Sequence, residues 1–211
     1  MRSLGDFLKK IIVAFFAFAL VLAQAAPSNA SDAYTAKWGS FKAQTFSGTG
    51  DDVITLSAAV KAGSITATHD GEANFVIWAL DTSMGQSGLQ VNTIGQYSGT
   101  TEFGFGFSAK KTKAFEITAD GNWTITVSSL PSAPKLPSSG SGDGVFKYSG
   151  GVPIWKVTHS GSANFVIWDY CSNGQTSLLV NKIGSYKGTL KGLGGSCIVA
   201  VRADGDWTIK K

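Results

Sequence analysis

The sequence holds few side chains that suit catalysis or metal binding. Its 211 residues include two histidines and two cysteines, and charged residues make up 15% of the chain. A metal site usually needs three or more ligands, and neither cysteine has a histidine or another cysteine at ligand spacing. A Gly-x-Ser-x-Gly elbow, a His-Glu-x-x-His motif and a phosphate-binding loop are also absent. These absences argue against the common hydrolase, metalloprotease and nucleotide-binding classes, and we expect neither a metal nor another cofactor.

Basic residues are not concentrated on one segment either. The formal charge of +4 falls to +2 when the three basic residues and one acidic residue of positions 1–30 are removed. The densest basic cluster, Lys110, Lys111 and Lys113, is typical of a solvated loop. A nucleic-acid-binding protein usually carries a concentrated basic face, so we expect no nucleic acid partner.

Long hydrophobic runs are confined to the N-terminus. Residues 11–23, "IIVAFFAFALVLA", follow a basic start and precede small residues, which is the order of a cleavable secretory signal. The run is shorter than the ~20 residues of a membrane-spanning helix, although an uncleaved anchor is the alternative. We expect a signal peptide over residues 1–25, with cleavage after Ala25 or as late as Ala30. The sequence thus predicts a protein exported to the cell envelope or the extracellular space, with no membrane span in the mature chain.

Cys171 and Cys197 are the two cysteines. In an exported chain such a pair is most simply a disulfide bond. The bond closes a loop of roughly 25 residues, which is worth about 3 kcal/mol in the chain-entropy model.

Most of the mature chain is an internal repeat. "ATHDGEANFVIW" (67–78) returns as "VTHSGSANFVIW" (157–168), and three other blocks recur in the same order. These blocks are "SGTGDDVITLS" (47–57) with "SGSGDGVFKYS" (139–149), "LQVNTIGQYSGT" (89–100) with "LLVNKIGSYKGT" (178–189), and "ITADGNWTIT" (117–126) with "VRADGDWTIK" (201–210). We therefore expect one structural unit used twice, over residues 31–126 and 139–211. The Pro- and Ser-rich residues 127–138 read as a linker.

Each copy has the pattern of short strands. Val, Ile, Thr, Phe and Trp are separated by Gly, Asp, Ser and Asn at intervals of several residues, and no helical periodicity follows the signal. We predict an all-β protein of two antiparallel β-sandwich domains, Ig-like or jelly-roll-like, with six or seven strands each. Residues 31–46 have no counterpart in the second copy, and are expected to form an extra edge strand or a loose arm.

The two histidines, His69 and His159, stand at the end of an inward-facing row in their strands. The favoured interpretation is structural, with each ring bonded to turn backbone or to Asn74 or Asn164. The alternative is a general base, which needs a nucleophile or an acid within reach. The nearby acids of the first copy are replaced by serine in the second, so the repeat itself favours a structural role.

The other repeated side chains also have structural interpretations. Strand parity places Trp123 and Trp207 in the core. Trp78 and Trp168 end the segment "NFVIW", which is apolar on both faces, and we expect it to form a central strand covered on both sides. Four residues remain as candidate binding groups: Tyr97, Tyr186, Asp120 and Asp204. The two aspartates precede glycine in hairpin turns, and together with Asp51 and Asp143 they are the basis of an alternative calcium-binding hypothesis.

The combined pattern "ATHxGxxNFVIW … LLVNxIGxYxGT … ADGxWTI" resembles a module of secreted and cell-envelope bacterial proteins that occurs singly or in tandem. The resemblance covers nearly all of residues 47–126 and 139–210, and it implies a fold but no biochemical role. We therefore expect an exported, non-catalytic binding or scaffolding protein whose partner is a polysaccharide, a wall component or another protein. A small hydrolase using His69 or His159, with a site in one copy or at the domain junction, is the alternative, and a calcium-dependent adhesion module is the third.

Overall fold

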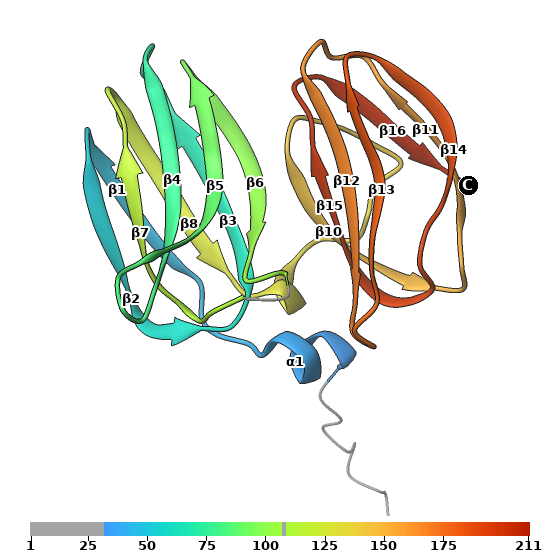
Figure 1. Cartoon of the computed structure of the whole chain (residues 1–211), viewed down its shortest axis with the longest axis horizontal. Helices are drawn as coiled ribbons and strands as arrows, with labels where there is room; N and C mark the ends of the chain where they lie inside the picture. The colour runs from blue at the N-terminus through green and yellow to red at the C-terminus, as the bar shows by residue number, and fades with distance from the viewer. Residues whose placement is uncertain (1–31, 107–108) are drawn as a thin grey trace, which may run out of the picture. The chain divides into compact units, whose positions relative to one another are not determined.

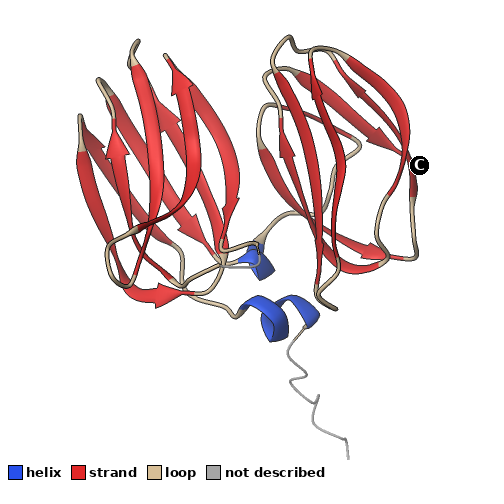
Figure 2. Ribbon diagram, in the orientation of Figure 1, coloured by secondary structure: helices blue, strands red, loops and turns tan. Residues whose placement is uncertain are grey.

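The computed structural model describes residues 32–106 and 109–211, which belong to one compact unit. The expected signal peptide lies outside the described residues. Within them the chain forms strands β1 to β16, one short α-helix and one 3-10 turn (Figures 1 and 2). No helix of the described part is long and apolar enough to span a bilayer.

The first copy forms a sandwich of two four-stranded antiparallel sheets. One sheet has the order β1-β8-β3-β6 and the other has the order β2-β7-β4-β5. The strands are β1 (Gln44–Thr49), β2 (Asp52–Val60), β3 (Gly63–His69), β4 (Asn74–Asp81), β5 (Gln86–Ile94), β6 (Tyr97–Phe103), β7 (Thr112–Thr118) and β8 (Asn122–Ser128).

The second copy repeats this topology strand for strand. Its sheets have the orders β9-β16-β11-β14 and β10-β15-β12-β13. The strands are β9 (Ser139–Ser141), β10 (Gly144–Gly150), β11 (Ile154–His159), β12 (Asn164–Cys171), β13 (Thr176–Ile183), β14 (Tyr186–Lys191), β15 (Gly195–Arg202) and β16 (Asp206–Lys210). The predicted all-β class and antiparallel sandwich architecture are confirmed.

Alternation along the strands builds each core between its two sheets. In β3, Ile65, Ala67 and His69 are buried while the residues between them are exposed, as a strand with one covered face requires. Trp123 and Trp207 are 2% exposed and belong to the two cores, as their parity predicts. Burying such aromatic side chains supplies much of the stability of small sandwiches.

The prediction for the strand "NFVIW" was wrong in one respect. Phe75 and Ile77 are fully buried, but Val76 and Trp78 are half-buried on the opposite face, and the second copy has the same pattern. In each sandwich this strand therefore has only one face in the core, so Trp78 and Trp168 are not core residues.

Residues 31–46 contain both an edge strand and an unexpected helix. Strand β1 begins at Gln44 but is not an extra strand, because β9 occupies the same place in the second copy. Helix α1 (Ala33–Trp38) precedes it. Asp32 caps the helix by accepting the N–H of Thr35 at 2.8 Å, and Gly39 ends it with a φ of 79°. A capping aspartate and a terminal glycine are ordinary helix signals, but six residues are too few to show a helical apolar stripe.

The linker is packed rather than extended. β8 continues to Ser128, and a 3-10 turn, η1 (Leu130–Ser132), follows. Leu130 is fully buried in a small third cluster with Tyr34 and Trp38 of α1 and with Val145 and Ile198 of the second sandwich. The helix and the linker thus contribute apolar side chains to the surface of that sandwich.

Candidate functional site

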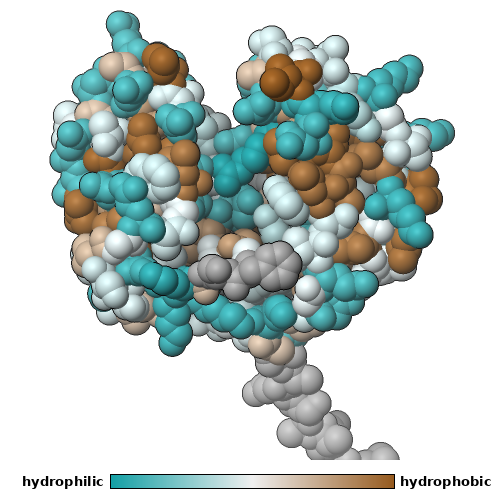
Figure 3. Space-filling view, viewed as in Figure 1, coloured by the Kyte–Doolittle hydropathy of each residue, from teal (hydrophilic) through white to brown (hydrophobic). Residues whose placement is uncertain are grey.

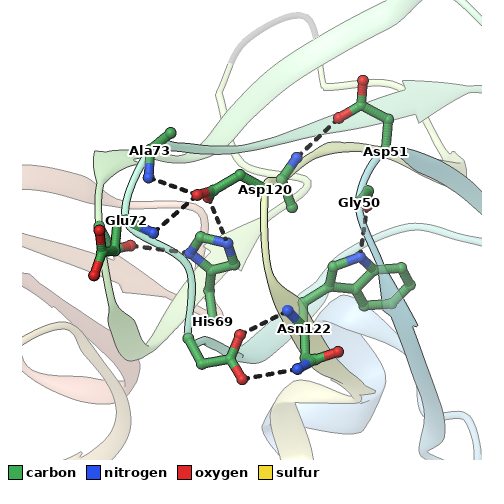
Figure 4. Close-up of polar contacts among 11 residues, drawn as sticks. Gly50, Asp51, His69, Glu72, Ala73, Asp120 and Asn122 are labelled. Carbon is green, nitrogen blue, oxygen red and sulfur yellow. Dashed lines mark hydrogen bonds and ion pairs between the residues drawn. The ribbon is translucent and has the colours of Figure 1, made fainter.

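His69 lies at the base of the β3–β4 turn with no exposed side-chain surface. Its ring stacks on Phe75 at a centroid distance of 4.4 Å and an interplanar angle of 5°. Nδ1–H donates to the carbonyl oxygen of Gly95 at 2.9 Å, and Nε2 lies 3.3 Å from Oδ1 of Asp120 (Figure 4). Nδ1 and one face of the ring therefore have protein partners, while Nε2 is buried beside the carboxylate without a hydrogen bond.

Asp120 links this histidine to the turn that follows it. Its Oδ2 accepts the N–H groups of Glu72 and Ala73, both at 2.9 Å (Figure 4). These backbone donors hold the pKa of the Asp120 carboxyl below its ordinary value, since they favour the charged form. One side chain of the β7–β8 turn thus fastens the β3–β4 turn, and His69 connects both to the β5–β6 turn at Gly95.

The second copy contains the same network. His159 stacks on Phe165 at 4.4 Å, its Nδ1–H donates to the carbonyl of Gly184 at 3.0 Å, and its Nε2 lies 3.3 Å from Asp204. Asp204 accepts the N–H groups of Ser162 and Ala163 at 2.8 Å each. Burial raises the pKa of the Asp204 carboxyl, but these donors outweigh it and the net shift is downward. We call each arrangement a His–Asp turn network.

The networks explain why glycine follows each histidine two positions later. A Cβ on Gly71 would lie 2.2 Å from Oδ1 of Asp120, and a Cβ on Gly161 would lie 2.0 Å from Oδ1 of Asp204. No side chain fits between the turn and its carboxylate. The repeated His-x-Gly therefore belongs to a packing arrangement.

Two sequence-based expectations about the histidines need correction. The acid partner thought to be missing exists in both copies, because Asp120 and Asp204 lie beside the ring nitrogens. Of the two kinds of ring partner expected, turn backbone is the one present, since Nδ1 donates to the carbonyls of Gly95 and Gly184. The other expected partners, Asn74 and Asn164, are exposed at the first positions of their strands. The two turn aspartates were predicted as binding or turn residues, and the structure uses them as turn residues.

Tyr97 and Tyr186, the two candidate aromatic binding groups, are half-buried and pack against their cores. Each side chain lies over the glycine two residues later: a Cβ on Gly99 would be 2.5 Å from the Tyr97 hydroxyl, and the second copy is alike. The hydroxyl of Tyr97 donates to Asp143 of the other sandwich at 2.8 Å. Burial is the main cause of the raised pKa of Tyr97, and the nearby Asp143 carboxylate adds to it.

Arg202 is the centre of a polar cluster that joins β15 to the first sandwich. Its guanidinium donates to Oε2 of Glu102 at 3.0 Å and to the carbonyl of Gln90 at 2.8 Å. Gln90 is the extra residue of a β-bulge in β5, which frees its carbonyl from the strand ladder. Burial raises the pKa of Glu102, and Arg202 acts against that shift. The cluster was not foreseen, since its members differ between the two copies.

The predicted disulfide between Cys171 and Cys197 is present. It joins β12 to β15 at the position where the first copy pairs Asp81 with Thr112. With the fully buried Asp169, the cysteines are the one group of potential metal ligands found among the described residues, but their sulfurs are bonded to each other. Burial raises the pKa of Asp169 to about 6, while the N–H of Leu193 partly opposes the shift.

Comparison with known proteins adds no functional assignment. No protein-family model matches the chain, and no curated protein matches it. Among solved structures the chain is similar to one described as a "putative secreted protein" from Parabacteroides distasonis ATCC 8503, at 11% sequence identity. The alignment covers 86% of this chain and 95% of that one, and its TM-score of 0.20 is too low to support any conclusion about this protein.

Proposed function

We propose that this is an exported, non-catalytic protein of the cell envelope or extracellular space that acts by binding or scaffolding. The observation that carries the proposal is the state of the two histidines. Both side chains have no exposed surface, and each lies in the same His–Asp turn network. A general base must reach a proton of its substrate within hydrogen-bond distance. In each ring Nδ1 is bonded to a backbone carbonyl, and Nε2 has no hydrogen-bond partner but is buried beside an aspartate, so neither nitrogen reaches the surface.

Exposed apolar side chains support a binding role. Ile94 and Ile183 are 77% and 79% exposed at equivalent positions of the two copies, and Leu89 and Leu178 are 43% and 42% exposed. Figure 3 shows hydrophobic residues in brown on the surface of each half, among polar residues in teal. Single exposed apolar residues are ordinary, but their recurrence at the same positions suits a contact surface that both sandwiches carry.

The test is capture of envelope components by the mature protein. Immobilised protein should retain a polysaccharide, wall or protein fraction, and the double variant Ile94→Asn/Ile183→Asn should retain less. Val53→Asn, at an exposed apolar position outside this repeated pair, is the matched control and should leave capture unchanged. Failure of the wild-type protein to retain any fraction or any ligand of a glycan array would contradict the proposal.

A hydrolase is the second candidate, and the carboxylate beside each Nε2 is the observation in its favour. Under that hypothesis His69→Phe and His159→Phe would abolish turnover of a model ester or glycoside while leaving stability unchanged. Calcium binding has weaker support, because Asp120 and Asp204 direct their Oδ2 atoms to backbone N–H groups. Identical thermal unfolding with calcium and with chelator would exclude it.

A further inference from the structure

The second sandwich is open at an edge that the first sandwich covers. In the first copy β1 pairs with β8 over six positions, from Gln44 with Val127 to Thr49 with Asn122. In the second copy β9 pairs with β16 over three positions only. The segment before β9 contains Pro134 and Pro137, which cannot donate to a strand ladder. It bonds instead to β10, where the N–H of Leu136 donates to the carbonyl of Lys147.

One substitution between the copies leaves an opening beside the core. Phe46 packs against the first core and stands in register with Ile125. Its counterpart in the repeat is Ser138, whose carbonyl accepts the N–H of Ile209 at 3.0 Å. A cavity of about 600 Å³ lies at this place in the second sandwich, and its lining includes Ser138 and Ile209.

The cavity has an apolar floor and a basic rim. Leu136, Tyr148, Trp155 and Ile209 supply apolar surface, and the Tyr148 and Trp155 rings meet edge to face at 5.2 Å. The lining also includes four lysines and no aspartate or glutamate: Lys135, Lys147, Lys210 and Lys211. We call this cavity the basic pocket.

The basic pocket is specific to the second copy. At the positions of its four lysines the first copy has Ala43, Thr55, Thr126 and Val127, and at those of Tyr148 and Trp155 it has Leu56 and Ile65. The repeat conserves the residues of the turn networks in both copies, yet six differences of charge or ring character gather around one cavity. A structural requirement common to both sandwiches cannot explain them, since the first sandwich folds without them.

We propose that the basic pocket binds an acidic saccharide, meaning a sugar ring or short chain that carries carboxylate or phosphate groups. A cavity of about 600 Å³ is in the size range of small-molecule sites. Lysine ammonium groups attract the anionic groups, and the apolar floor suits the non-polar faces of sugar rings. Lys147 already donates its ammonium to the carbonyl of Pro131, so Lys135, Lys210 and Lys211 are the cations that the rim offers to a ligand. A wholly apolar ligand would not use these charges, and a small inorganic anion would not use the floor. The inference deepens the proposed binding function and rests on it.

Isothermal titration with three probes tests the proposal: trigalacturonate, a phosphorylated trisaccharide and a neutral trisaccharide. At least one acidic probe should bind more tightly than the neutral one, and added salt should weaken it. The variant Lys210→Gln/Lys211→Gln should bind about tenfold more weakly. Lys182→Gln/Lys187→Gln removes the same charge from exposed positions of β13 and β14 and should change affinity by less than about twofold.

A second variant fills the pocket as the first sandwich does. Ser138→Phe restores the residue type of Phe46 and should abolish binding without lowering the melting temperature, whereas Ser138→Ala should leave binding intact. The proposal for the basic pocket would be overturned if neither acidic probe bound. It would also be overturned if the two lysine variants lost affinity for the probe equally. If envelope fractions were still captured in that case, the general binding function would stand. If nothing were captured, both proposals would fail.

Discussion

At the residue scale, each His–Asp turn network holds a buried imidazole whose hydrogen bond is expensive to lose, and a partly exposed aspartate. Nδ1–H of His69 donates to the backbone carbonyl of Gly95, which lies in a turn outside the strand ladder. Asp120 accepts two N–H groups of the β3–β4 turn. When a buried polar group loses its hydrogen-bond partner, the fold loses more stability than that hydrogen bond had contributed. Replacing a residue of either network should therefore lower the free energy of unfolding.

His69→Phe keeps the ring against Phe75 but removes both polar contacts. We expect the free energy of unfolding to fall by about 1–3 kcal/mol, as measured by urea denaturation. His159→Phe should give a similar loss, because its surroundings are the same. A variant with unchanged stability that had lost binding or turnover would show that the ring is functional instead.

Asp169 predicts a pH dependence in the second sandwich. Its folded-state pKa of about 6 exceeds the ordinary 3.8, so the folded protein holds this proton more tightly than the unfolded chain does. The protonated Asp169 carboxyl makes its full contribution to the free energy of unfolding below about pH 4. That contribution is lost as the pH rises through about 6. Asp169→Asn should therefore raise the free energy of unfolding at pH 8 by up to about 3 kcal/mol and leave it unchanged at pH 4.

Asp206 is exposed, so Asp206→Asn is the control for Asp169→Asn. It should not show this pH-dependent gain in the free energy of unfolding. Equal effects of the Asp169 change at both pH values would contradict the assigned burial. The counterpart of Asp169 in the first copy is Ala79, which shows that the sandwich does not require a carboxylate there.

Sequence reasoning succeeded where the cause is local and failed where it is distant. The inward position of His69 follows from strand alternation, and the Asp-Gly turns follow from residue type. The contact between His69 and Asp120 joins residues about fifty positions apart, and no local pattern reports it. The contact between Arg202 and Glu102 was missed for the same reason. So was the position of Trp78 on the face of β4 that lies outside the core.

At the element scale, the two copies fasten one strand pair in different ways. In the first sandwich Asp81 of β4 accepts from Lys110, which lies two residues before β7, at 2.6 Å. In the second, Cys171 of β12 is bonded to Cys197 of β15. The repeat predicted equivalent strands, and the disulfide followed from the cysteine count. That the disulfide and the Asp81–Lys110 ion pair occupy equivalent places in the two copies is shown only by the strand register.

Reduction of the disulfide should destabilise the second sandwich selectively. The bridge has a sequence separation of 26 residues, so its loss should lower the free energy of unfolding by about 3 kcal/mol. Hydrogen exchange should show faster opening of β12 and β15 after reduction, with β4 and β7 unchanged. Uniform loss of protection across both sandwiches would contradict this assignment.

At the scale of the whole molecule, the cluster around Arg202 joins the two sandwiches. Arg202→Met leaves Glu102 buried without its cation, and we expect a loss of about 2–4 kcal/mol in urea unfolding monitored by tryptophan fluorescence. The double variant Arg202→Met/Glu102→Gln should recover part of that loss, because the uncompensated charge is gone. Equal stabilities of the single and double variants would show that the pair is not coupled.

The central claim is that the repeated histidines are framework residues in two copies of one environment. The chain has only these two histidines, so the imidazole region of a nitrogen–proton NMR spectrum of the tag-free mature protein reports on them alone. We predict two rings with similar shifts, each with a proton on Nδ1 that exchanges slowly with water. Rings that differ, or whose Nδ1 protons exchange freely, would contradict the account.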